Sequence, residues 1–207
     1  NPAMASVGDT IDSRSTTFDQ FQPKFSITTN AGNTSYYASY GYGFRSGGFN
    51  STGSAATTDF WLNSGNPFGL GVVGAGISVN DEFDKEVSRA FEVGFKGTYL
   101  DGRLAMNGAY FNTNVTDNQF FEFFAGPWGL LRVVTTIDEL DISGYELDFK
   151  YAVTDNLKID GAFGITDGEI KENAHRPSTI GNDAPLAPEH TFNLGFQYDT
   201  PVTKDFD

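Results

Sequence analysis

Two groups of acidic side chains in this 207-residue sequence have the oxygen ligands that a hard cation such as Ca²⁺ prefers. The first group comprises Asp59, Asp81, Glu82, Asp84 and Glu86, and the second comprises Asp138, Glu139 and Asp141. Neither group has the ligand spacing of a calcium-binding loop. We therefore interpret both as a solvated acidic exterior and expect neither a bound metal nor a cofactor.

The residues that could support covalent catalysis are few. His175 and His190 lie near Arg176 and Glu189, but no serine or aspartate pattern completes a catalytic triad. The absence of cysteine excludes thiolate nucleophiles and thiolate metal sites. The glycines around Tyr42 are not followed by a helix, as a phosphate-binding loop requires. We expect a binding protein rather than an enzyme.

Aromatic side chains in the long connections are the remaining candidates for ligand recognition. Such side chains stack on sugars or on aromatic chelators such as catecholates. The candidates are Trp61, Phe68, Phe120, Phe121, Phe123, Phe124 and Trp128. The alternative interpretation is that these residues pack loops against each other, or continue strands beyond a membrane.

Composition narrows the class of protein that presents these residues. The 13 basic and 27 acidic side chains give a net charge of −14, which excludes a partner held by its phosphate backbone, so we expect no nucleic acid. Aromatic residues make up 15% of the chain, and there are 24 glycines. This composition favours β structure. No apolar run is long enough for a membrane-spanning helix.

Apolar and polar residues alternate with a period of two along seven stretches of the chain, which is the pattern of β-strands. The stretches are 21–28, 36–45, 91–99, 104–110, 145–151, 157–165 and 191–198. The connections between them alternate in length. Short turns are expected near 30–33, 100–102 and 153–156, and long extracellular loops near 46–86, 117–140 and 168–188. Outer-membrane barrels sort their connections in this way, so the sequence predicts an all-β, antiparallel transmembrane β-barrel.

The two faces of the expected strands agree with this environment. Aromatic residues end the apolar rows, for example Tyr99 at the rim near the short turns and Phe91 eight residues away. In a tilted strand this separation spans roughly 20 Å along the membrane normal, close to the height of a lipid-facing band. The polar rows would face the interior of the barrel. The charged residues predicted to line it are Arg45, Glu92, Lys96, Glu146, Asp148 and Lys150.

Four stretches resemble the β-barrel of TonB-dependent outer-membrane receptors. Tyr36–Asn50 ends in the family-like GFRSGGFN, and Glu86–Gln119 resembles a family hairpin that turns at D-G-R-L. Ser143–Asp167 and Pro185–Tyr198 resemble a later hairpin and the A-P-E-x-T opening of a late strand. One departure is Val115, which stands where the second stretch would carry an aromatic residue.

The resemblance implies that residues 1–207 are part of such a receptor barrel, about seven strands of a larger barrel of 22. Neither a plug domain nor a TonB box is visible in the sequence, and its last residues do not resemble a closing strand. The implied function is TonB-coupled uptake of a scarce nutrient across the outer membrane. The substrate would be a ferric siderophore, cobalamin, haem or an oligosaccharide. The implied partners are outer-membrane lipid and, through the missing plug, the TonB complex, and the interior charges would hold the plug.

Two other interpretations remain open from the sequence. One is a complete small outer-membrane barrel of eight strands with a structural or adhesive role, which needs residues 4–16 to supply a strand although they alternate poorly. The other is a soluble carbohydrate-binding β-sandwich. Exposed rows of Phe and Tyr argue against the sandwich, because soluble monomers rarely expose large apolar patches.

Overall fold

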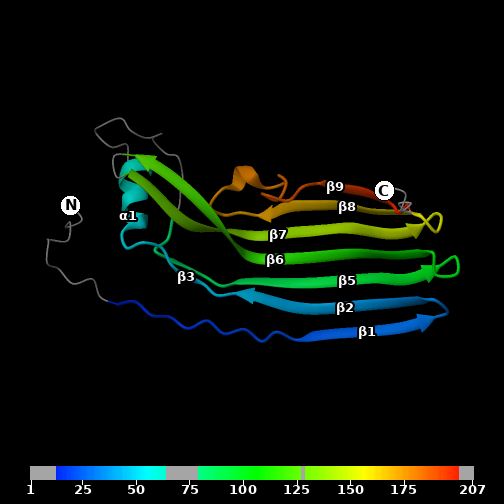
Figure 1. Ribbon diagram of the computed structural model, residues 1–207. Helices are drawn as coiled ribbons and strands as arrows, with labels where there is room; N and C mark the ends of the chain where they lie inside the picture. Colours follow the sequence, from blue (N-terminus) through cyan, green and yellow to red (C-terminus); the bar gives the residue numbers. More distant parts are fainter. Residues whose placement is uncertain (1–12, 64–78, 127–128, 201–207) are drawn as a thin grey trace.

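Figure 1 shows the computed structural model of the protein, which describes residues 13–63, 79–126 and 129–200. Among these residues, seven strands pair in one antiparallel sheet, in the order in which they follow along the chain. They are β1 (Lys24–Ala31), β2 (Thr34–Arg45), β5 (Glu86–Tyr99), β6 (Leu104–Gly126), β7 (Gly129–Ala152), β8 (Leu157–Glu172) and β9 (His190–Tyr198). The predicted all-β, antiparallel fold class is confirmed.

Tight turns join consecutive strands at one end of the sheet, which we call the turn end (Figure 1). Gly32 and Gly102 have φ values of 60° and 87° there, a left-handed conformation that glycine adopts without steric cost. The turn between β7 and β8 is held differently. The Thr154 hydroxyl accepts a hydrogen bond from the backbone N–H of Leu157 at 2.9 Å.

An arginine ties two of these turns together. Arg103 is the last residue of the β5–β6 turn, and its Nε donates to the carbonyl oxygen of Ala152 at 2.9 Å. Its Nη2 donates to the carbonyl oxygen of Val153, at the start of the β7–β8 turn. The arginine of the D-G-R-L sequence therefore fastens one hairpin to the next at the turn end.

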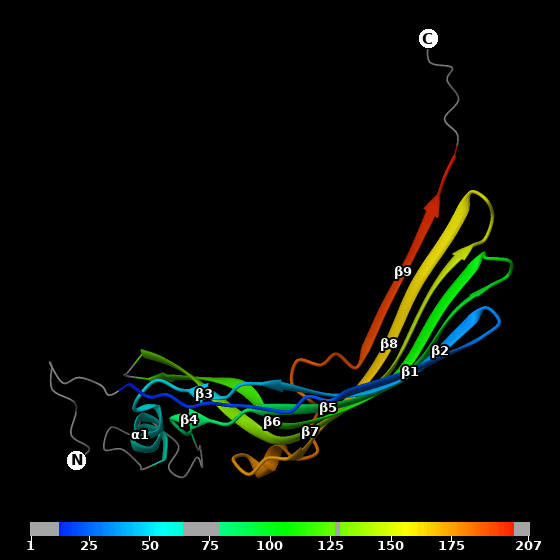
Figure 2. The same cartoon turned by 90° about the horizontal axis from the view of Figure 1, so that it is seen from below.

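The opposite end of the sheet, which we call the loop end, carries the long connections (Figures 1 and 2). These connections contain short elements of their own. They are β3 (Gly48–Phe49), α1 (Ser54–Thr58), the single π-helical turn η1 (Asp59–Asn63), β4 (Glu82–Phe83) and the 3₁₀ turn η2 (Pro177–Thr179). β3 pairs with β4 as a small separate ribbon. No helix among the described residues is long and apolar enough to cross a membrane.

The expectation of a long loop over 117–140 is wrong. β6 and β7 continue through this segment as a paired hairpin, from Asn118 opposite Ile137 to Gly126 opposite Gly129. We call this projecting part the β6–β7 arm; in Figure 1 it extends past its neighbours toward α1. Phenylalanine and β-branched residues are strong strand formers. Because apolar residues occupy both faces of the arm, it lacks the alternation by which the other strands were predicted.

A small hydrophobic core lies at the loop end. It joins Val115 of β6, Ile137 and Leu140 of β7, Ile170 of β8, and Ala184 of the β8–β9 connection. β8 itself runs seven residues beyond the alternating stretch that ends at residue 165, and the connection then returns alongside it. This core fixes the base of the β6–β7 arm and the returning connection to the sheet.

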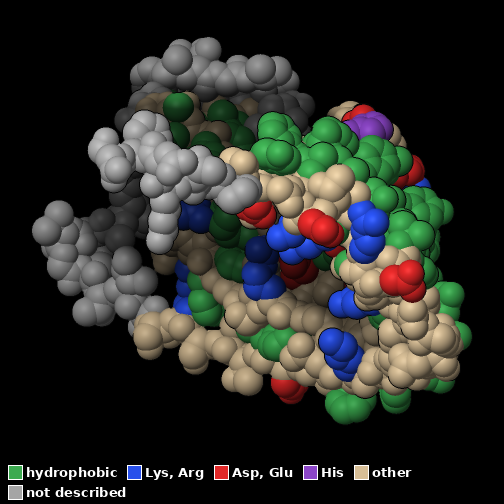
Figure 3. Space-filling model, turned by 45° about the vertical axis from the view of Figure 1, so that its right-hand side comes forward, with side chains coloured by type: hydrophobic (Ala, Val, Ile, Leu, Met, Phe, Trp, Pro, Cys, Tyr) green, Lys and Arg blue, Asp and Glu red, His purple; other side chains and the backbone are tan. Residues whose placement is uncertain are grey.

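The rest of the sheet has one apolar face that nothing in the described structure covers. Residues of this face are among the most exposed hydrophobic side chains, including Ile27 at 71%, Phe192 at 74% and Phe196 at 81%. No second sheet packs against it among the described residues, as a β-sandwich would require. Figure 3 shows charged side chains over the hollow of the sheet and hydrophobic side chains along its outer margin. This arrangement suits a lipid-facing outer surface and a polar interior.

The assignment of the two faces can be tested by introducing arginine, in separate variants, at two adjacent positions of β8. Phe163 lies on the apolar face and is 42% exposed, whereas Ala162 lies on the polar face opposite Asp148. In the intact protein in lipid vesicles, Phe163→Arg should lower the free energy of unfolding by about 2–4 kcal/mol, because it places a charge in hydrocarbon. Ala162→Arg should change it by only about 0.5 kcal/mol. Equal losses in denaturant titrations would contradict the assignment of faces.

Candidate functional site

All six charged residues predicted to line an interior lie on one face of the sheet. Alternate residues of a strand share a face, and the register carries that face from strand to strand. Lys96 of β5 pairs with Asn107 of β6, which pairs with Asp148 of β7. We call this face the polar face; the six predicted residues on it are Arg45, Glu92, Lys96, Glu146, Asp148 and Lys150.

Polar contacts across β2, β5, β6 and β7 organise the middle of this face. The Tyr37 hydroxyl donates to Glu92 Oε1 at 2.6 Å, and Lys96 Nζ lies 5.8 Å from the centre of the Tyr37 ring. Asn107 Nδ2 donates to Asp148 Oδ1 at 2.8 Å. These groups surround a surface hollow of about 200 Å³, whose polar lining is Tyr37, Glu92, Lys96, Asn107, Glu146 and Asp148. Three carboxylates against one lysine make this hollow suited to a cationic partner.

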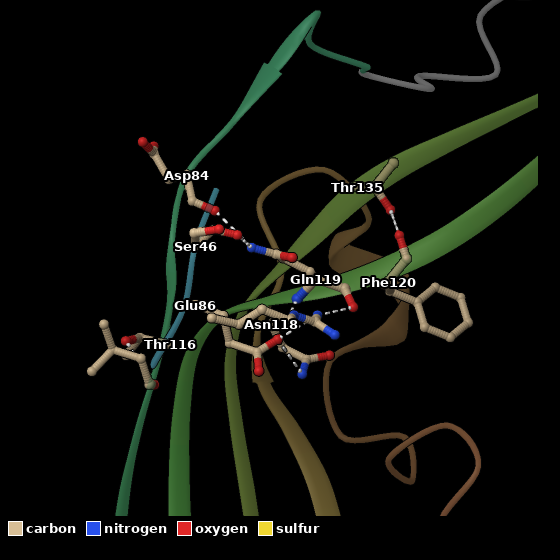
Figure 4. A network of polar contacts seen from close by, with 10 residues as sticks. Ser46, Asp84, Glu86, Thr116, Asn118, Gln119, Phe120 and Thr135 are labelled. Atoms are coloured by element: carbon tan, nitrogen blue, oxygen red, sulfur yellow. Dashed lines mark hydrogen bonds and ion pairs between the residues drawn. The ribbon is translucent and has the colours of Figure 1, made fainter. Parts of the chain in front are cut away.

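At the loop end, one carboxylate joins three strands where the arm departs from the sheet (Figure 4). Glu86 Oε2 accepts from Arg45 Nη2 at 2.7 Å, from the backbone N–H of Gln119 at 2.8 Å and from Asn118 Nδ2 at 3.2 Å. Arg45 Nη2 also donates to the carbonyl oxygen of Gln119 at 2.7 Å. We call this set the Glu86 junction. Its backbone groups lie where β6 no longer pairs with β5, so the side chains replace lost ladder bonds.

A second clamp on the arm comes from Asn50, which the sequence analysis did not single out. Its side-chain Oδ1 accepts from the backbone N–H of Val134 at 2.7 Å, and its Nδ2 donates to the Val134 carbonyl oxygen at 2.9 Å. The buried amide thus pairs with β7 as a neighbouring strand would. The available signal was position: Asn50 ends the GFRSGGFN stretch that also contains Arg45.

The five predicted recognition aromatics that the structure describes do not form one cluster. Phe121 and Phe123 are 44% and 61% exposed on one face of the β6–β7 arm, and the Arg132 guanidinium lies 4.0 Å from the Phe121 ring centre. Phe120 faces the other way. Phe124 is half-buried near the tip of the arm. Trp61 in η1 packs edge-on against Phe60, with ring centroids 5.1 Å apart. Phe68 and Trp128 lie outside the described residues.

The inward face of the arm borders a cavity of about 220 Å³ beneath the β8–β9 connection. Phe120, His175 and Asn173 are among its lining residues. An ion pair between Glu122 of the arm and Arg176 of the connection closes one side. The cavity therefore lies between the β6–β7 arm and the β8–β9 connection.

The predicted acidic groups serve mainly structural roles. Asp81 accepts hydrogen bonds from the backbone N–H groups of Gly53 and Ala55 at 3.3 and 3.0 Å, at the start of α1. Burial raises the pKa of Asp117, and the nearby Asp84 and Asp138 carboxylates raise that pKa further. No three His, Cys, Asp or Glu side chains among the described residues are placed to hold a metal ion together.

Comparison with known proteins shows which family this chain belongs to. Residues 4–207 match the family model described as TonB dependent receptor-like, beta-barrel. The chain belongs to this family. Its members are outer-membrane β-barrel proteins of Gram-negative bacteria, and the outer membrane is where this chain resides. The recognition of this family from four short stretches is confirmed.

Curated relatives of this receptor-family chain include two named for metal chelates. The catecholate siderophore receptor Fiu of Escherichia coli is 27% identical over 135 residues, which are 65% of this chain and 17% of the relative. The metal-pseudopaline receptor CntO of Pseudomonas aeruginosa is 32% identical over 114 residues, 54% of this chain and 15% of the relative. The chain therefore spans less than a fifth of the length of these relatives.

Solved receptor structures share the fold. The copper transporter OprC superposes with a TM-score of 0.58 at 19% identity, covering 86% of this chain and 24% of that protein. The ferric preacinetobactin receptor BauA of Acinetobacter baumannii superposes with a TM-score of 0.57 at 20% identity, covering 88% and 23%. The seven-stranded sheet thus has the fold of about a quarter of each of these two proteins.

The Glu86 junction should behave as a coupled unit in this receptor barrel. A double-mutant cycle with Arg45→Ala and Glu86→Ala should give a coupling free energy of about 1–2 kcal/mol, because Glu86 is only 19% exposed and the contact is charge-assisted. The control pair is Lys158 and Asp199, 3.8 Å apart and both 55% exposed, whose coupling should stay below about 0.5 kcal/mol. Similar couplings in denaturant titrations of the intact protein would refute the role of the junction.

The raised pKa of Asp117 predicts a pH-dependent stability. A carboxyl with a higher pKa in the folded state is most stabilising below its unfolded pKa, and this contribution is lost as the pH rises through the folded pKa. Asp117→Asn should therefore stabilise the arm at pH 7 and lose this advantage below a pH of about 4. Asp101→Asn is the matched control, because Asp101 has the same φ of 55° but lies exposed in a turn. A pH-independent effect of Asp117→Asn would contradict the prediction.

Proposed function

We propose that this chain forms consecutive wall strands of a TonB-coupled receptor that takes up a chelated metal ion of the ferric-siderophore type. The family carries the proposal of uptake. The substrate class is supported by relatives named for a catecholate siderophore and for metal-pseudopaline. The sequence also left cobalamin, haem and oligosaccharides open as substrates, and neither of these two relatives is named for any of them.

The polar face of the sheet would serve as the inner wall against which a plug rests. The acidic hollow around Glu92, Glu146 and Asp148 offers carboxylates to basic groups of that plug. Its hydrogen bonds from Tyr37 and Asn107 hold two of these carboxylates in place before any partner arrives. Prearranged acceptors reduce the entropy cost of binding, and this is the support for a docking role.

The exposed aromatics of the β6–β7 arm would contact the substrate first. Phe121 and Phe123 present flat apolar faces at the loop end, and Arg132 beside Phe121 adds a positive charge. Aromatic chelators offer both a ring for stacking and, when loaded with metal, a negative charge. In this proposal the protein forms and breaks no covalent bond in its substrate.

Uptake of a ferric catecholate by cells that express the intact protein tests the proposal. We expect radiolabelled iron to enter only when TonB is present, because transport draws its energy from that complex. Phe123→Ala should raise the half-saturating concentration about twofold to tenfold, the loss expected for one aromatic contact. Phe196→Ala removes an exposed phenylalanine from the opposite, lipid-facing part of the wall and should leave it unchanged.

Two outcomes would contradict this function. Iron entry that persists without TonB would show a passive pore. Uptake of none of the ferric chelates offered, including catecholate and hydroxamate types, would remove the proposed substrate class. Unaltered half-saturation in Phe123→Ala, with TonB-dependent uptake intact, would refute only the role of the arm.

A further inference from the structure

Four glycines of the sheet lie directly opposite an aromatic residue of the preceding strand, one in each strand pair from β2–β5 to β7–β8. In each case the aromatic ring lies over the glycine, because a β-carbon built on that glycine would come within 2.5–2.7 Å of a ring atom. We call each such pair a ring–glycine joint. The four joints are Tyr37–Gly94, Phe95–Gly108, Phe111–Gly144 and Phe149–Gly161.

The joints alternate between the two faces of the sheet. Phe95–Gly108 and Phe149–Gly161 lie on the apolar face and join strands that a tight turn already connects. A tight turn fixes the register of its two strands. Tyr37–Gly94 lies on the polar face and joins β2 to β5, which are connected at the loop end by residues 46–85 (Figure 1). The register of this pair therefore needs another determinant.

The alternation of apolar and polar residues does not define the register of β2 against β5 uniquely. A slip of one residue exchanges the faces, but a slip of two returns every side chain to its own face. The backbone ladder is equally regular after such a slip. The residue opposite Tyr37 is what changes. Gly94 is replaced by Glu92 or Lys96, its neighbours on the same face of β5.

The Tyr37 ring fits only one of these registers. Over Gly94 it covers backbone that has no side chain of its own, and its hydroxyl donates to Glu92 Oε1 at 2.6 Å. Opposite Glu92 or Lys96, the ring would meet a long charged side chain in the space that it occupies over the glycine. An aromatic ring over a strand glycine is one of the means by which a sheet pins its register.

We propose that the Tyr37–Gly94 joint selects the register of β2 against β5 while the wall assembles. A slip of two residues would move β2 by about 7 Å along β5. It would separate Tyr37 from the position in which it borders the acidic hollow with Glu92 and Asn107. The joint thus brings together polar groups of strands that are distant in the sequence. This role lies in assembly and does not depend on the substrate that the receptor takes up.

Cysteine cross-links formed while the intact protein refolds into lipid vesicles report the register, and this chain has no cysteine that would compete. Val93→Cys is combined with Ala38→Cys, its partner in the observed register, or with Tyr36→Cys or Tyr40→Cys, its partners after a slip of two. A disulfide requires β-carbons about 4 Å apart, which diagonal neighbours do not reach. Each cysteine pair therefore cross-links in one register only.

With Tyr37 in place, the cross-link between positions 38 and 93 should predominate from the earliest oxidation times. Tyr37→Leu should raise the slipped cross-links about fivefold, the preference expected of one cross-strand pair. Tyr37→Phe keeps the ring and loses the hydroxyl, and it should leave them rare. Tyr42→Leu is the matched control, because this aromatic residue of the same strand lies opposite Arg89 and not a glycine. It should also leave them rare.

The cross-links are read on denaturing gels, so a variant that does not complete its assembly still reports its register. Slipped cross-links that stay equally rare in Tyr37→Leu would overturn the proposal. An equal rise in Tyr37→Phe would assign the register to the hydrogen bond with Glu92 and would overturn the role of the ring. An equal rise in Tyr42→Leu would overturn it too, since any lost aromatic residue would then have the same effect.

Discussion

Inside a bilayer, no water is available to hydrogen-bond a peptide group, so every N–H and C=O of a spanning strand must pair with a neighbouring strand. Between the two edge strands β1 and β9, the ladders of the described sheet meet that requirement where they cross the apolar band. β2 and β5 pair continuously from Thr34–Gly97 to Arg45–Glu86. Because the register cannot slip by one residue without exchanging the two faces, this backbone pairing also determines which side chains face lipid and which face the interior.

The candidate site follows from that register. Glu92 and Val93 are adjacent in the chain but lie on opposite faces, one hydrogen-bonded to Tyr37 and the other 42% exposed to the surroundings. Where the ladder between β5 and β6 ends, side chains take over its task. Glu86 and Asn50 each satisfy backbone groups of the β6–β7 arm that no strand reaches. At the loop end, side-chain hydrogen bonds thus take the place of the backbone ladder.

Sequence reasoning predicted the elements that obey the period of two. The stretches around Phe95, Leu147 and Phe163 alternate because lipid lies on one side and a polar interior on the other. The β6–β7 arm was missed because both of its faces carry phenylalanine, so its sequence does not alternate. Asn50 and Asp81 could not have been assigned their roles, because each bonds backbone groups 26 to 84 residues away in the sequence. The resemblance to family sequences marked Asn50 without explaining it.

The side-chain pairing of Asn50 with Val134 affects whether neighbouring molecules can associate through an exposed strand edge. The arm projects beyond β8, so its outer strand would otherwise present free peptide groups to any neighbour. Open edges of that kind invite a strand from another molecule and are a route to aggregation. The Asn50 amide pairs with both backbone groups of Val134 and donates its second N–H to the Asn80 carbonyl oxygen, so it leaves no donor for a further strand. Asn50 therefore occupies the β7 edge at Val134 and ends strand addition there, protecting the arm against edge-to-edge association.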